Sequence, residues 1–503
     1  MKISKQRFCI PSSRPGHDTF TPSLALLFLV TSAAIIFGNG CWRPSPEEST
    51  ATPDTAVSQP EPRPRPDIVF IIVDTLRADR LGMRRDDVPL MPFLESFSKE
   101  SWSFTRAASQ ASWTRPSMAS AFTSLYAGVH NQQFGIRMEV VEGQDHTVDA
   151  LSEDLETMAE YFKEAGYATL GVQANWNMRP LFGVSQGFDR YEMMTSGQNA
   201  TYITDLCLEM AKDTSSPFFL YVHYIEPHAP YAPPEHYKNL FHSIPEITDT
   251  DRELLATYAT GYYPDKVRWD LQFRETPPDP QFSEAGKKYV EIMYDAEVRF
   301  ADDEVGRLIQ GIRASHPGAI IVFSADHGEE LWEHGSVGHG KTVYNEVLHV
   351  PLIFSFPGEL PRTEDARVEL IDILPTLAAK IGLPARDWWQ GRSLLAHTAD
   401  FLSPVYAETR TSIREANVYL LSVMHENMKL ILDMPGNKHW LYQLESDPGE
   451  LNPITDTAQS ETLMLLLKQY RADNEAHPLH ASPTVTNVVD QETRDILRSQ
   501  GYF

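Results

Sequence analysis

Four residues of this 503-residue chain have side chains that could act together in catalysis. They are Asp74, the adjacent pair Asp326 and His327, and Thr114. Two carboxylates and an imidazole offer oxygen and nitrogen ligands, which suit Mg²⁺, Mn²⁺ or Zn²⁺ better than a metal that prefers thiolates. A threonine hydroxyl on such a metal can lose its proton and attack phosphorus or sulfur. We therefore predict a metal-assisted nucleophilic site in which all four residues, Thr114 included, contact the metal.

Both acidic positions directly follow a predicted strand. The runs 67–73 (DIVFIIV) and 319–323 (AIIVF) are short, apolar and rich in branched side chains, which is typical of strands covered on both faces. Ligands of an open parallel sheet lie beyond the carboxyl ends of its strands. We therefore expect Asp74, Asp326 and His327 to meet at one edge of a sheet. Taken alone, Asp74 could equally be the cap of a following helix.

Thr114 lies just ahead of a predicted helix start at Pro116, which is followed by small residues. The amide groups and the positive dipole end of a helix favour an anion at this place. The simpler alternative is that Thr114 only caps the helix. Arg115, its neighbour, could clamp an anionic substrate or could lie at the surface as a solvated charge.

Apolar runs and helical patterns alternate along most of the chain, which predicts an α/β fold with a large, mostly parallel sheet flanked by helices. The further predicted strands are 169–172, 218–222 and 350–354, and the predicted helices are 151–165 and 285–311. Near the C-terminus, short strands predict a smaller antiparallel sheet, at 405–408, 418–423, 428–432 and 440–444, followed by a helix at 459–476. A closed β/α barrel is the alternative, but the strand spacing is too irregular to favour it.

The N-terminus has the pattern of a targeting segment. Basic residues precede an apolar stretch at 24–37, which is shorter than a stable membrane span and typical of a secretory signal. The stretch ends at Cys41 in a sequence that resembles a bacterial lipoprotein cleavage site, except for Gly38, where Leu or Val is usual. An uncleaved anchor and a plain signal with an incidental Cys41 are the alternatives. All three predict export, to the periplasm or cell envelope of a bacterium.

These patterns divide the chain into four predicted parts. They are a signal or lipoprotein-type segment at 1–41, a Pro-rich disordered tether at 42–66, a catalytic α/β domain at 67–400, and a small sheet with the terminal helix at 401–503.

Composition excludes some classes of function. The formal net charge is −26, so nucleic acid is an unsuitable partner because phosphate backbones are held by clustered Lys and Arg. The hydrophobic share of 42% and charged share of 22% are those of a globular protein. Three cysteines define no disulfide framework.

Six segments, in this order, resemble the sulfatase family of the alkaline-phosphatase superfamily. They are DIVFIIVDTLRADRLG (67–82), SWTRPSMASAFTSLYAGVH (112–130), FFLYVHYIEPHAPYAPP (218–234), YDAEVRFADDEVGRLI (294–309), IIVFSADHGEELWEHGSVGHGKTVYNEVLHVPLIF (320–354) and LYQLESDPGELNPI (441–454). The resemblance implies a large α/β domain with a smaller C-terminal sheet domain. It also implies a nucleophile bound to one or two divalent ions, Mn, Mg, Zn or Ca, with the first three favoured by the histidine ligand.

Roles follow from motif position. The resemblance implies that Thr114 is the nucleophile and that Asp74, Asp326 and His327 are metal ligands. It matches His228 to a family histidine that contacts the substrate or leaving group, and it places His339 and Lys341 near further active-site positions, with a surface or core role as the alternative for these two. The predicted substrate-binding residues are Arg115, Lys341 and Asn175. His223 and His334 are interpreted as structural or supporting.

Three departures separate the chain from standard sulfatases, which convert a Cys or Ser in Cys-x-Pro-x-Arg to formylglycine. This chain has Thr114, which cannot form that aldehyde, and Met118 in place of the arginine. The paired aspartates of standard sulfatases are here Asp74-Thr75, and their Asp-Asn is here Asp326-His327. The departures resemble relatives that use a metal-bound threonine on phosphate esters, such as lipoteichoic acid synthases and phosphoethanolamine transferases.

We therefore expect an exported, metal-dependent hydrolase or transferase of sulfate or phosphate esters, with phosphate favoured. Its substrate would be a small molecule, glycan or lipid ester, and the N-terminus could attach it to a membrane. One alternative is a sulfuric ester hydrolase with an unmodified threonine. Another is a catalytically silent, surface-tethered binding protein. The segment 236–282 could form a lid over the substrate or pack on the surface of the domain.

Overall fold

The computed structural model describes residues 65–133, 147–194, 198–259, 281–395, 403–413, 416–480 and 485–488. The predicted targeting segment with Cys41 lies outside these ranges, as does the predicted tether apart from its last two residues. The predicted domain boundary at 400/401 and residues 260–280 of the predicted lid also lie outside them. Across the described ranges, no helix combines the length and the apolar character that crossing a membrane requires.

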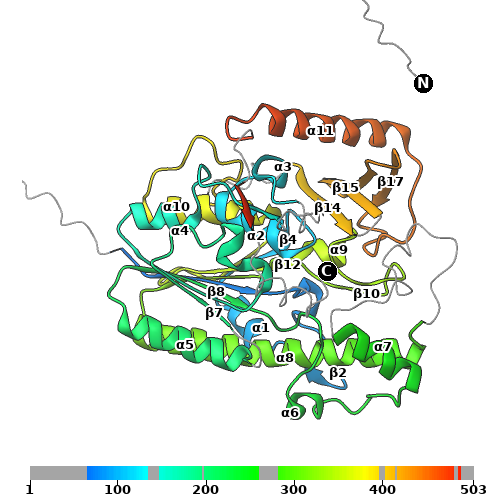
Figure 1. Ribbon diagram of the computed structural model, residues 1–503, viewed down its shortest axis with the longest axis horizontal. Helices are drawn as coiled ribbons and strands as arrows, with labels where there is room; N and C mark the ends of the chain where they lie inside the picture. The colour runs from blue at the N-terminus through cyan, green and yellow to red at the C-terminus, as the bar shows by residue number, and fades with distance from the viewer. Residues whose placement is uncertain are drawn as a thin grey trace, which may run out of the picture. The chain divides into compact units, whose positions relative to one another are not determined.

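The core is an eight-stranded sheet with the order β13-β4-β12-β9-β1-β8-β6-β7 (Figure 1). Only β12 runs antiparallel to its neighbours β9 and β4, so the prediction of a large, mostly parallel sheet is confirmed. The strands are β1 (Ile68–Val73), β4 (Trp102–Ala108), β6 (Ala168–Gln173), β7 (Arg190–Met193), β8 (Phe218–Tyr224), β9 (Ile320–Ser324), β12 (His349–Ser355) and β13 (Arg362–Glu369).

Helices cover both faces of this sheet (Figure 1). One face carries α1 (Pro92–Lys99), α5 (Ala200–Asp213) and α8 (Glu284–Ser315), and the other carries α2 (Thr114–Thr123), α4 (Met158–Glu164) and α10 (Ile373–Ile381). The predicted helix 285–311 is confirmed as α8. The predicted helix 151–165 is wrong in its first half, because Thr157 and Glu160 form a capping box that starts α4 at Met158.

The smaller sheet has the order β14-β15-β16-β17, and all its pairs are antiparallel, as predicted. Its strands are β14 (Val405–Ile413), β15 (Ala416–His425), β16 (Met428–Asp433) and β17 (Lys438–Gln443). The predicted terminal helix is α11 (Thr457–Ala476), which packs on the sheet through Leu463, Leu467 and Tyr470 (Figure 1).

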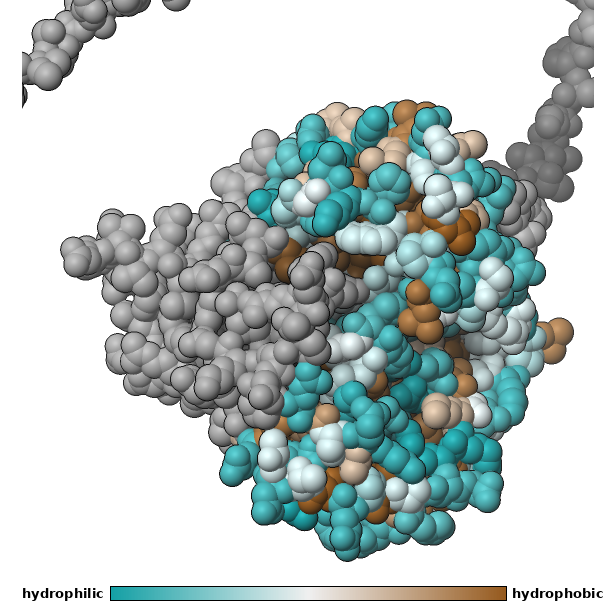
Figure 2. Space-filling model, turned by 90° about the vertical axis from the view of Figure 1, so that its right-hand side faces the viewer, coloured by the Kyte–Doolittle hydropathy of each residue, from teal (hydrophilic) through white to brown (hydrophobic). Residues whose placement is uncertain are grey.

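Short elements connect these layers. The helices are α3 (Ala127–His130), α6 (Glu235–Lys238), α7 (Asp249–Ala259), α9 (Asn345–Leu348), η1 (Ala78–Arg80), η2 (Trp176–Met178), η3 (Pro180–Phe182) and η5 (Leu370–Asp372). The strands are β2 (Arg84–Arg85), β3 (Val88–Pro89), β5 (Thr147–Ala150), β10 (Glu330–Leu331), β11 (Val337–Gly338) and β18 (Val485–Val488). The face shown in Figure 2 is mainly hydrophilic, and its hydrophobic residues are scattered.

Candidate active site

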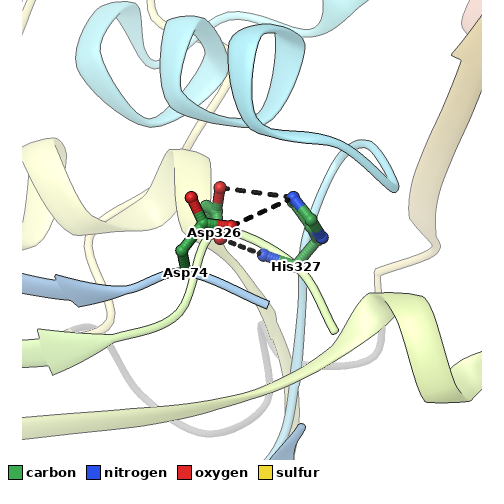
Figure 3. Close-up of side chains that lie close together, drawn as sticks. All are labelled: Asp74, Asp326 and His327. Carbon is green, nitrogen blue, oxygen red and sulfur yellow. Dashed lines mark hydrogen bonds and ion pairs between the residues drawn. The ribbon is translucent and has the colours of Figure 1, made fainter. Parts of the chain in front are cut away.

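The two predicted carboxylates meet at one edge of the large sheet. Strands β1 and β9 are parallel neighbours with Ile72 opposite Ser324, so the residues that follow them emerge side by side. Asp74, Asp326 and His327 are fully buried, and each offers a ligand atom within 4.8 Å of the others. Figure 3 shows the three side chains facing one another at the strand ends. The expected convergence at the carboxyl ends of the strands is therefore present.

Asp74 has one oxygen fixed by donors and one without a donor. Its Oδ2 accepts hydrogen bonds from Asn175 Nδ2 and from His223 Nε2, the latter at 3.1 Å. The His223 ring is itself held by Tyr221, whose hydroxyl donates to Nδ1 at 2.6 Å. Asp74 Oδ1 accepts no hydrogen bond from any residue in the described ranges. A buried carboxylate oxygen without a donor is costly unless a cation faces it.

Asp326 likewise has one carboxylate oxygen with hydrogen-bond donors and one without. Its Oδ1 accepts the backbone N–H groups of Thr75 at 3.3 Å and His327 at 2.9 Å, whereas no described residue donates to Oδ2. The His327 ring donates from Nδ1 to the carbonyl of Gly328 at 2.8 Å. This bond leaves the lone pair of Nε2 facing the acidic pair, 3.4 Å from Asp326 Oδ2 and 3.8 Å from Asp74 Oδ1.

The electrostatics of the three groups favour a bound cation. Burial raises the pKa of Asp326, and the charge of Asp74 raises it further. Burial alone would raise the pKa of Asp74, but the hydrogen bond from His223 and the charges of nearby histidines hold it below its usual range. Burial lowers the pKa of His327, which keeps its ring neutral. Two repelling carboxylates beside a neutral imidazole fit a divalent ion.

Thr114 completes this donor set. Its Oγ1 lies 3.4 Å from His327 Nε2 and accepts a hydrogen bond from Asn175 Nδ2 at 3.1 Å. The helix α2 begins at Thr114 itself, two residues before the predicted start at Pro116, and Trp113 is the N-cap. The alternative of a plain helix cap is therefore wrong, because the hydroxyl points to the site rather than to the helix backbone.

The turn after Asp74 is strained. Thr75 has φ 55°, a left-handed conformation that is uncommon for a β-branched residue. The hydroxyl of Tyr294 donates to the carbonyl of Thr75 at 2.8 Å and accepts from the backbone N–H of Arg77 at 3.2 Å. These bonds hold the turn that directs Asp74 into the site and brings the Thr75 N–H to Asp326.

Two further histidines approach the donor set. The ring centroid of His339 lies 5.0 Å from that of His228 and 4.5 Å from that of His327. His228 donates from Nδ1 to the carbonyl of Ala229 at 2.6 Å. Burial alone would lower the pKa of His228, but the charges of Asp74 and Glu329 raise it above its usual value. The structure therefore brings His228 and His339, both predicted from the sequence, to the same place.

The three predicted substrate-binding residues are all buried. Arg115 is 1% exposed, so the alternative of a solvated surface charge is wrong. It lies with its guanidinium carbon 3.7 Å from the ring centroid of Phe182 and donates to Asn177 Oδ1 at 3.0 Å. The backbone N–H of Asn177 donates to Asn175 Oδ1 at 2.6 Å, which turns the Asn175 amide nitrogen toward Thr114.

Lys341 is also buried, so a surface role for it is wrong. It donates from Nζ to the carbonyl of Val337 at 2.7 Å. Burial lowers the pKa of Lys341 to about 7, although Glu330 and Glu329 oppose the shift. Its contact with a transferred group stays a prediction, as do the substrate contacts of Arg115 and Asn175.

Glu329 was missed by the sequence reasoning. It is fully buried, and its Oε1 accepts from His339 Nδ1 at 2.8 Å, while its Oε2 accepts from the hydroxyl of Tyr231 at 2.9 Å. The signal available was its place two residues after His327, in the same loop at the strand end. His223 was interpreted as structural or supporting, which agrees with its hydrogen bond to Asp74.

A second group with ligand spacing lies in the same loop. Glu330, His334 and Glu346 offer ligand atoms within 4.8 Å of one another. His334 uses Nδ1 for Glu346 Oε1 at 2.7 Å and Nε2 for the carbonyl of Glu450 at 3.2 Å. Glu330 Oε1 accepts the backbone N–H of Ser336 at 2.9 Å. With both ring nitrogens engaged, this group fits the structural role expected for His334.

The match to known families decides the classification. A family model described as Sulfatase matches residues 66–383, and one described as N-sulphoglucosamine sulphohydrolase, C-terminal, matches residues 333–476. The chain belongs to the sulfatase family. It is thus an ester hydrolase of that family with the predicted α/β fold.

Relatives in the sulfatase family include the uncharacterized sulfatase YidJ of Escherichia coli strain K12. It is 22% identical over 456 residues, which cover 78% of this chain and 83% of YidJ. Iduronate 2-sulfatase of Homo sapiens is 25% identical over 394 residues, which cover 63% of this chain and 69% of the relative.

Solved structures support the same fold. Phosphonate monoester hydrolase SpPMH from Silicibacter pomeroyi superposes with a TM-score of 0.62 at 20% identity, covering 83% of this chain and 96% of the other. A protein solved in complex with its substrate D-glucosamine-2-N,6-O-disulfate gives a TM-score of 0.65 at 19% identity, covering 83% of this chain and 100% of the other.

Proposed function

We propose that this protein is a metal-dependent hydrolase or transferase of sulfate or phosphate esters in which Thr114 is the nucleophile, with phosphate esters favoured. One observation carries the proposal. The hydroxyl of Thr114 lies beside His327 Nε2, among two buried carboxylates that each keep one oxygen without a donor. No ordinary packing role explains this convergence of a hydroxyl, an imidazole lone pair and two such oxygens.

Four residues would hold the ion: Asp74, Asp326, His327 and Thr114. When bound, a divalent ion such as Mn²⁺, Mg²⁺ or Zn²⁺ supplies Lewis acidity that lowers the pKa of the threonine hydroxyl and offsets negative charge on the transferred group. The oxygen and nitrogen donors suit these ions.

The chain's own groups then orient the reaction. Asn175 Nδ2 holds Thr114 Oγ1 in place, and its amide orientation is fixed by the backbone of Asn177. The N-terminus of α2 favours the negative charge that develops on the transferred group. His228, whose pKa is raised by the charges of Asp74 and Glu329, gives a proton from Nε2 to the leaving oxygen. Arg115 and Lys341 are the proposed cations for the anionic substrate.

The residue types of the site support a phosphate ester. A formylglycine hydrate releases sulfate by collapsing to the aldehyde, whereas an ester of Thr114 must be attacked by water or an acceptor. The substrate class proposed is therefore a small-molecule, glycan or lipid ester whose phosphoryl group passes through Thr114. The phosphonate monoester hydrolase among the solved structures of similar fold is consistent with chemistry at phosphorus on this scaffold.

A sulfuric ester hydrolase with an unmodified threonine is the second candidate. The family match and the names of the relatives, such as iduronate 2-sulfatase, favour it. A silent binding protein is disfavoured, because binding an anion does not require the buried acidic pair. We further propose that the protein is exported, with Cys41 as the point of lipid attachment.

The experiment is a substrate panel with the full-length protein. Aryl sulfate, aryl phosphate monoester and aryl phosphodiester are each tested with Mn²⁺, Mg²⁺, Zn²⁺ or Ca²⁺, and Thr114→Ala is the control. We expect turnover of a phosphate ester that disappears in the variant while the variant still folds and binds metal. Turnover of the sulfate instead would favour the second candidate, and full activity of Thr114→Ala would refute the proposed nucleophile.

A further inference from the structure

The two histidines beside the nucleophile have different partners. His228 donates from Nδ1 to a neutral carbonyl, that of Ala229, whereas His339 donates from Nδ1 to the carboxylate of Glu329 at 2.8 Å. The ring centroids of the two histidines are 5.0 Å apart, so the two rings lie side by side next to the donor set.

Glu329 is held rigidly in its position. It is fully buried, and each carboxylate oxygen accepts one hydrogen bond, from His339 and from the hydroxyl of Tyr231. Its backbone carbonyl also accepts from Arg77 Nη1 at 3.1 Å. A side chain fixed by two donors, on a backbone fixed by a third, sets the direction of the His339 ring. It also keeps the ring proton on Nδ1, which leaves the lone pair on Nε2.

We propose that Glu329 is a positioning residue that holds His339 as the proton acceptor for the water or alcohol that releases the Thr114 ester. The inference rests on the proposed function, because it concerns the second half of that reaction. Thr114 Oγ1 has Asn175 and His327 as its hydrogen-bond neighbours in the described ranges, so His339 is not placed to take the threonine proton.

The proposed reaction has two halves, each with its own proton transfers. In the first half, Thr114 Oγ1 gives its proton to solvent and bonds to phosphorus, the bond from phosphorus to the leaving oxygen breaks, and that oxygen takes a proton from His228. Water then enters the place of the leaving group and gives one proton to His339 Nε2, while its oxygen bonds to phosphorus. The bond from phosphorus to Thr114 Oγ1 breaks, Oγ1 takes a proton from solvent, and inorganic phosphate leaves. The cycle closes when His339 gives its proton to solvent and His228 regains one from solvent. Glu329 stabilises the positive charge that His339 carries in between.

A second glutamate–histidine pair, Glu346 and His334, differs from Glu329 and His339 in the second nitrogen of the ring. Glu346 accepts from His334 Nδ1 at 2.7 Å, but His334 Nε2 is occupied by the carbonyl of Glu450. In contrast, His339 Nε2 makes no hydrogen bond within the described part of the chain, and His339 is 21% exposed at its side chain. The hydrogen bonds of the two glutamate–histidine pairs are thus similar in length. Only His339 has a ring nitrogen left for a substrate atom.

The test is pre-steady-state kinetics of Glu329→Gln in the full-length protein. The probe is whichever 4-nitrophenyl ester of the panel above the wild-type protein hydrolyses, and acid-quenched samples are digested to measure the adduct on Thr114 by mass spectrometry. We expect steady turnover to fall by about 100-fold. The first turnover should fall by a smaller factor, because the charge of Glu329 also raises the pKa of His228. The adduct on Thr114 then accumulates, because its formation does not need His339.

Two further variants show whether the effect comes from the position of Glu329. Tyr231→Phe removes one donor to Glu329 without changing charge, and it should shift the ratio of first turnover to steady turnover in the same direction by a smaller factor. Glu346→Gln alters the matched pair and should leave this ratio at the wild-type value.

An equal loss of the first and the steady turnover in both Glu329→Gln and Tyr231→Phe would overturn the proposal. Wild-type kinetics in both variants would overturn it as well. Failure of the proposed function looks different, since Thr114→Ala would then keep its turnover whatever Glu329 does.

Discussion

Two groups of acidic residues and histidine lie in or beside the loop after β9, and both have the spacing of metal ligands. In the group Asp74, Asp326 and His327, two carboxylate oxygens have no donor within the described residues, and an imidazole lone pair faces them. In the group Glu330, His334 and Glu346, both ring nitrogens already have partners. The comparison teaches that unmet hydrogen-bonding capacity, rather than ligand spacing, separates a metal site from a structural cluster.

The second group also has a different neighbour. It contacts Glu450, which follows the smaller sheet and forms an ion pair with Lys429 of β16 at 2.7 Å, with both side chains fully buried. Glu450 also accepts the backbone N–H of Asn345 at 2.6 Å. The group therefore stabilises the contact between the smaller sheet and the loop that contains His339 and Lys341.

The largest contrast is expected from removing one carboxylate charge in each group. Asp326→Asn should lower metal affinity by more than about 100-fold, because even partners that only support a ligand cost 10–100-fold. Turnover should fall with it. Glu330→Gln should keep wild-type metal affinity, which is measured by metal titration followed by fluorescence or calorimetry. Equal affinity losses in the two variants would remove the distinction between the groups.

A smaller effect is expected from His223→Gln. His223 binds no metal in this account but donates to Asp74 Oδ2, so its loss should weaken metal binding by about 10–100-fold while the fold is retained. Metal titration of the purified variant, with circular dichroism as the control for folding, measures this. Unchanged affinity would show that Asp74 does not need His223 to be a ligand.

The structural group should respond in stability rather than in activity. Glu346→Gln removes a charged partner of His334, whose side chain is 8% exposed, and should lower the free energy of unfolding by about 1.5–3 kcal/mol. Metal affinity should stay at the wild-type value. Denaturant unfolding with and without metal measures both quantities. A loss of metal affinity in this variant would assign the second group to the metal.

The smallest expected effect is that the loss of stability in Glu346→Gln depends on pH. Burial would lower the pKa of His334, but the hydrogen bond and charge of Glu346 raise it above its usual 6.5. The protonated ring therefore favours the folded state fully below the unfolded pKa, and this contribution disappears as pH rises through the folded pKa. The stability difference between the wild-type protein and Glu346→Gln should shrink as pH rises above about 6.5. A constant difference would mean that His334 stays neutral.

The sequence predicts the strands that carry the metal ligands because their signal is local. The runs that became β1 and β9 are apolar throughout, and Asp74 and Asp326 follow them directly. β4 and β13 were missed because their sequences, WSFTRAA and RTEDARVE, include polar residues. Their place in the sheet comes from pairing with each other and with β12, which no local pattern reveals.

The supporting side chains depend on pairings that are distant along the chain. The contact of His223 with Asp74 follows from the register of β8 on β1, in which His223 lies opposite Ile72. Glu329 is assigned only once the loop brings His339 and Tyr231 to it. Residue type and position in a motif could identify the ligands, whereas the residues that hold them require the folded backbone.

The most direct test of this account is a crystal of the full-length protein soaked with Mn²⁺ and measured for anomalous scattering. We predict one peak within about 2.0–2.4 Å of Asp74 Oδ1, Asp326 Oδ2 and His327 Nε2, with Thr114 Oγ1 in contact with the ion. No peak is expected at Glu330, His334 and Glu346. A peak at that second group, with none beside Thr114, would contradict the central claim.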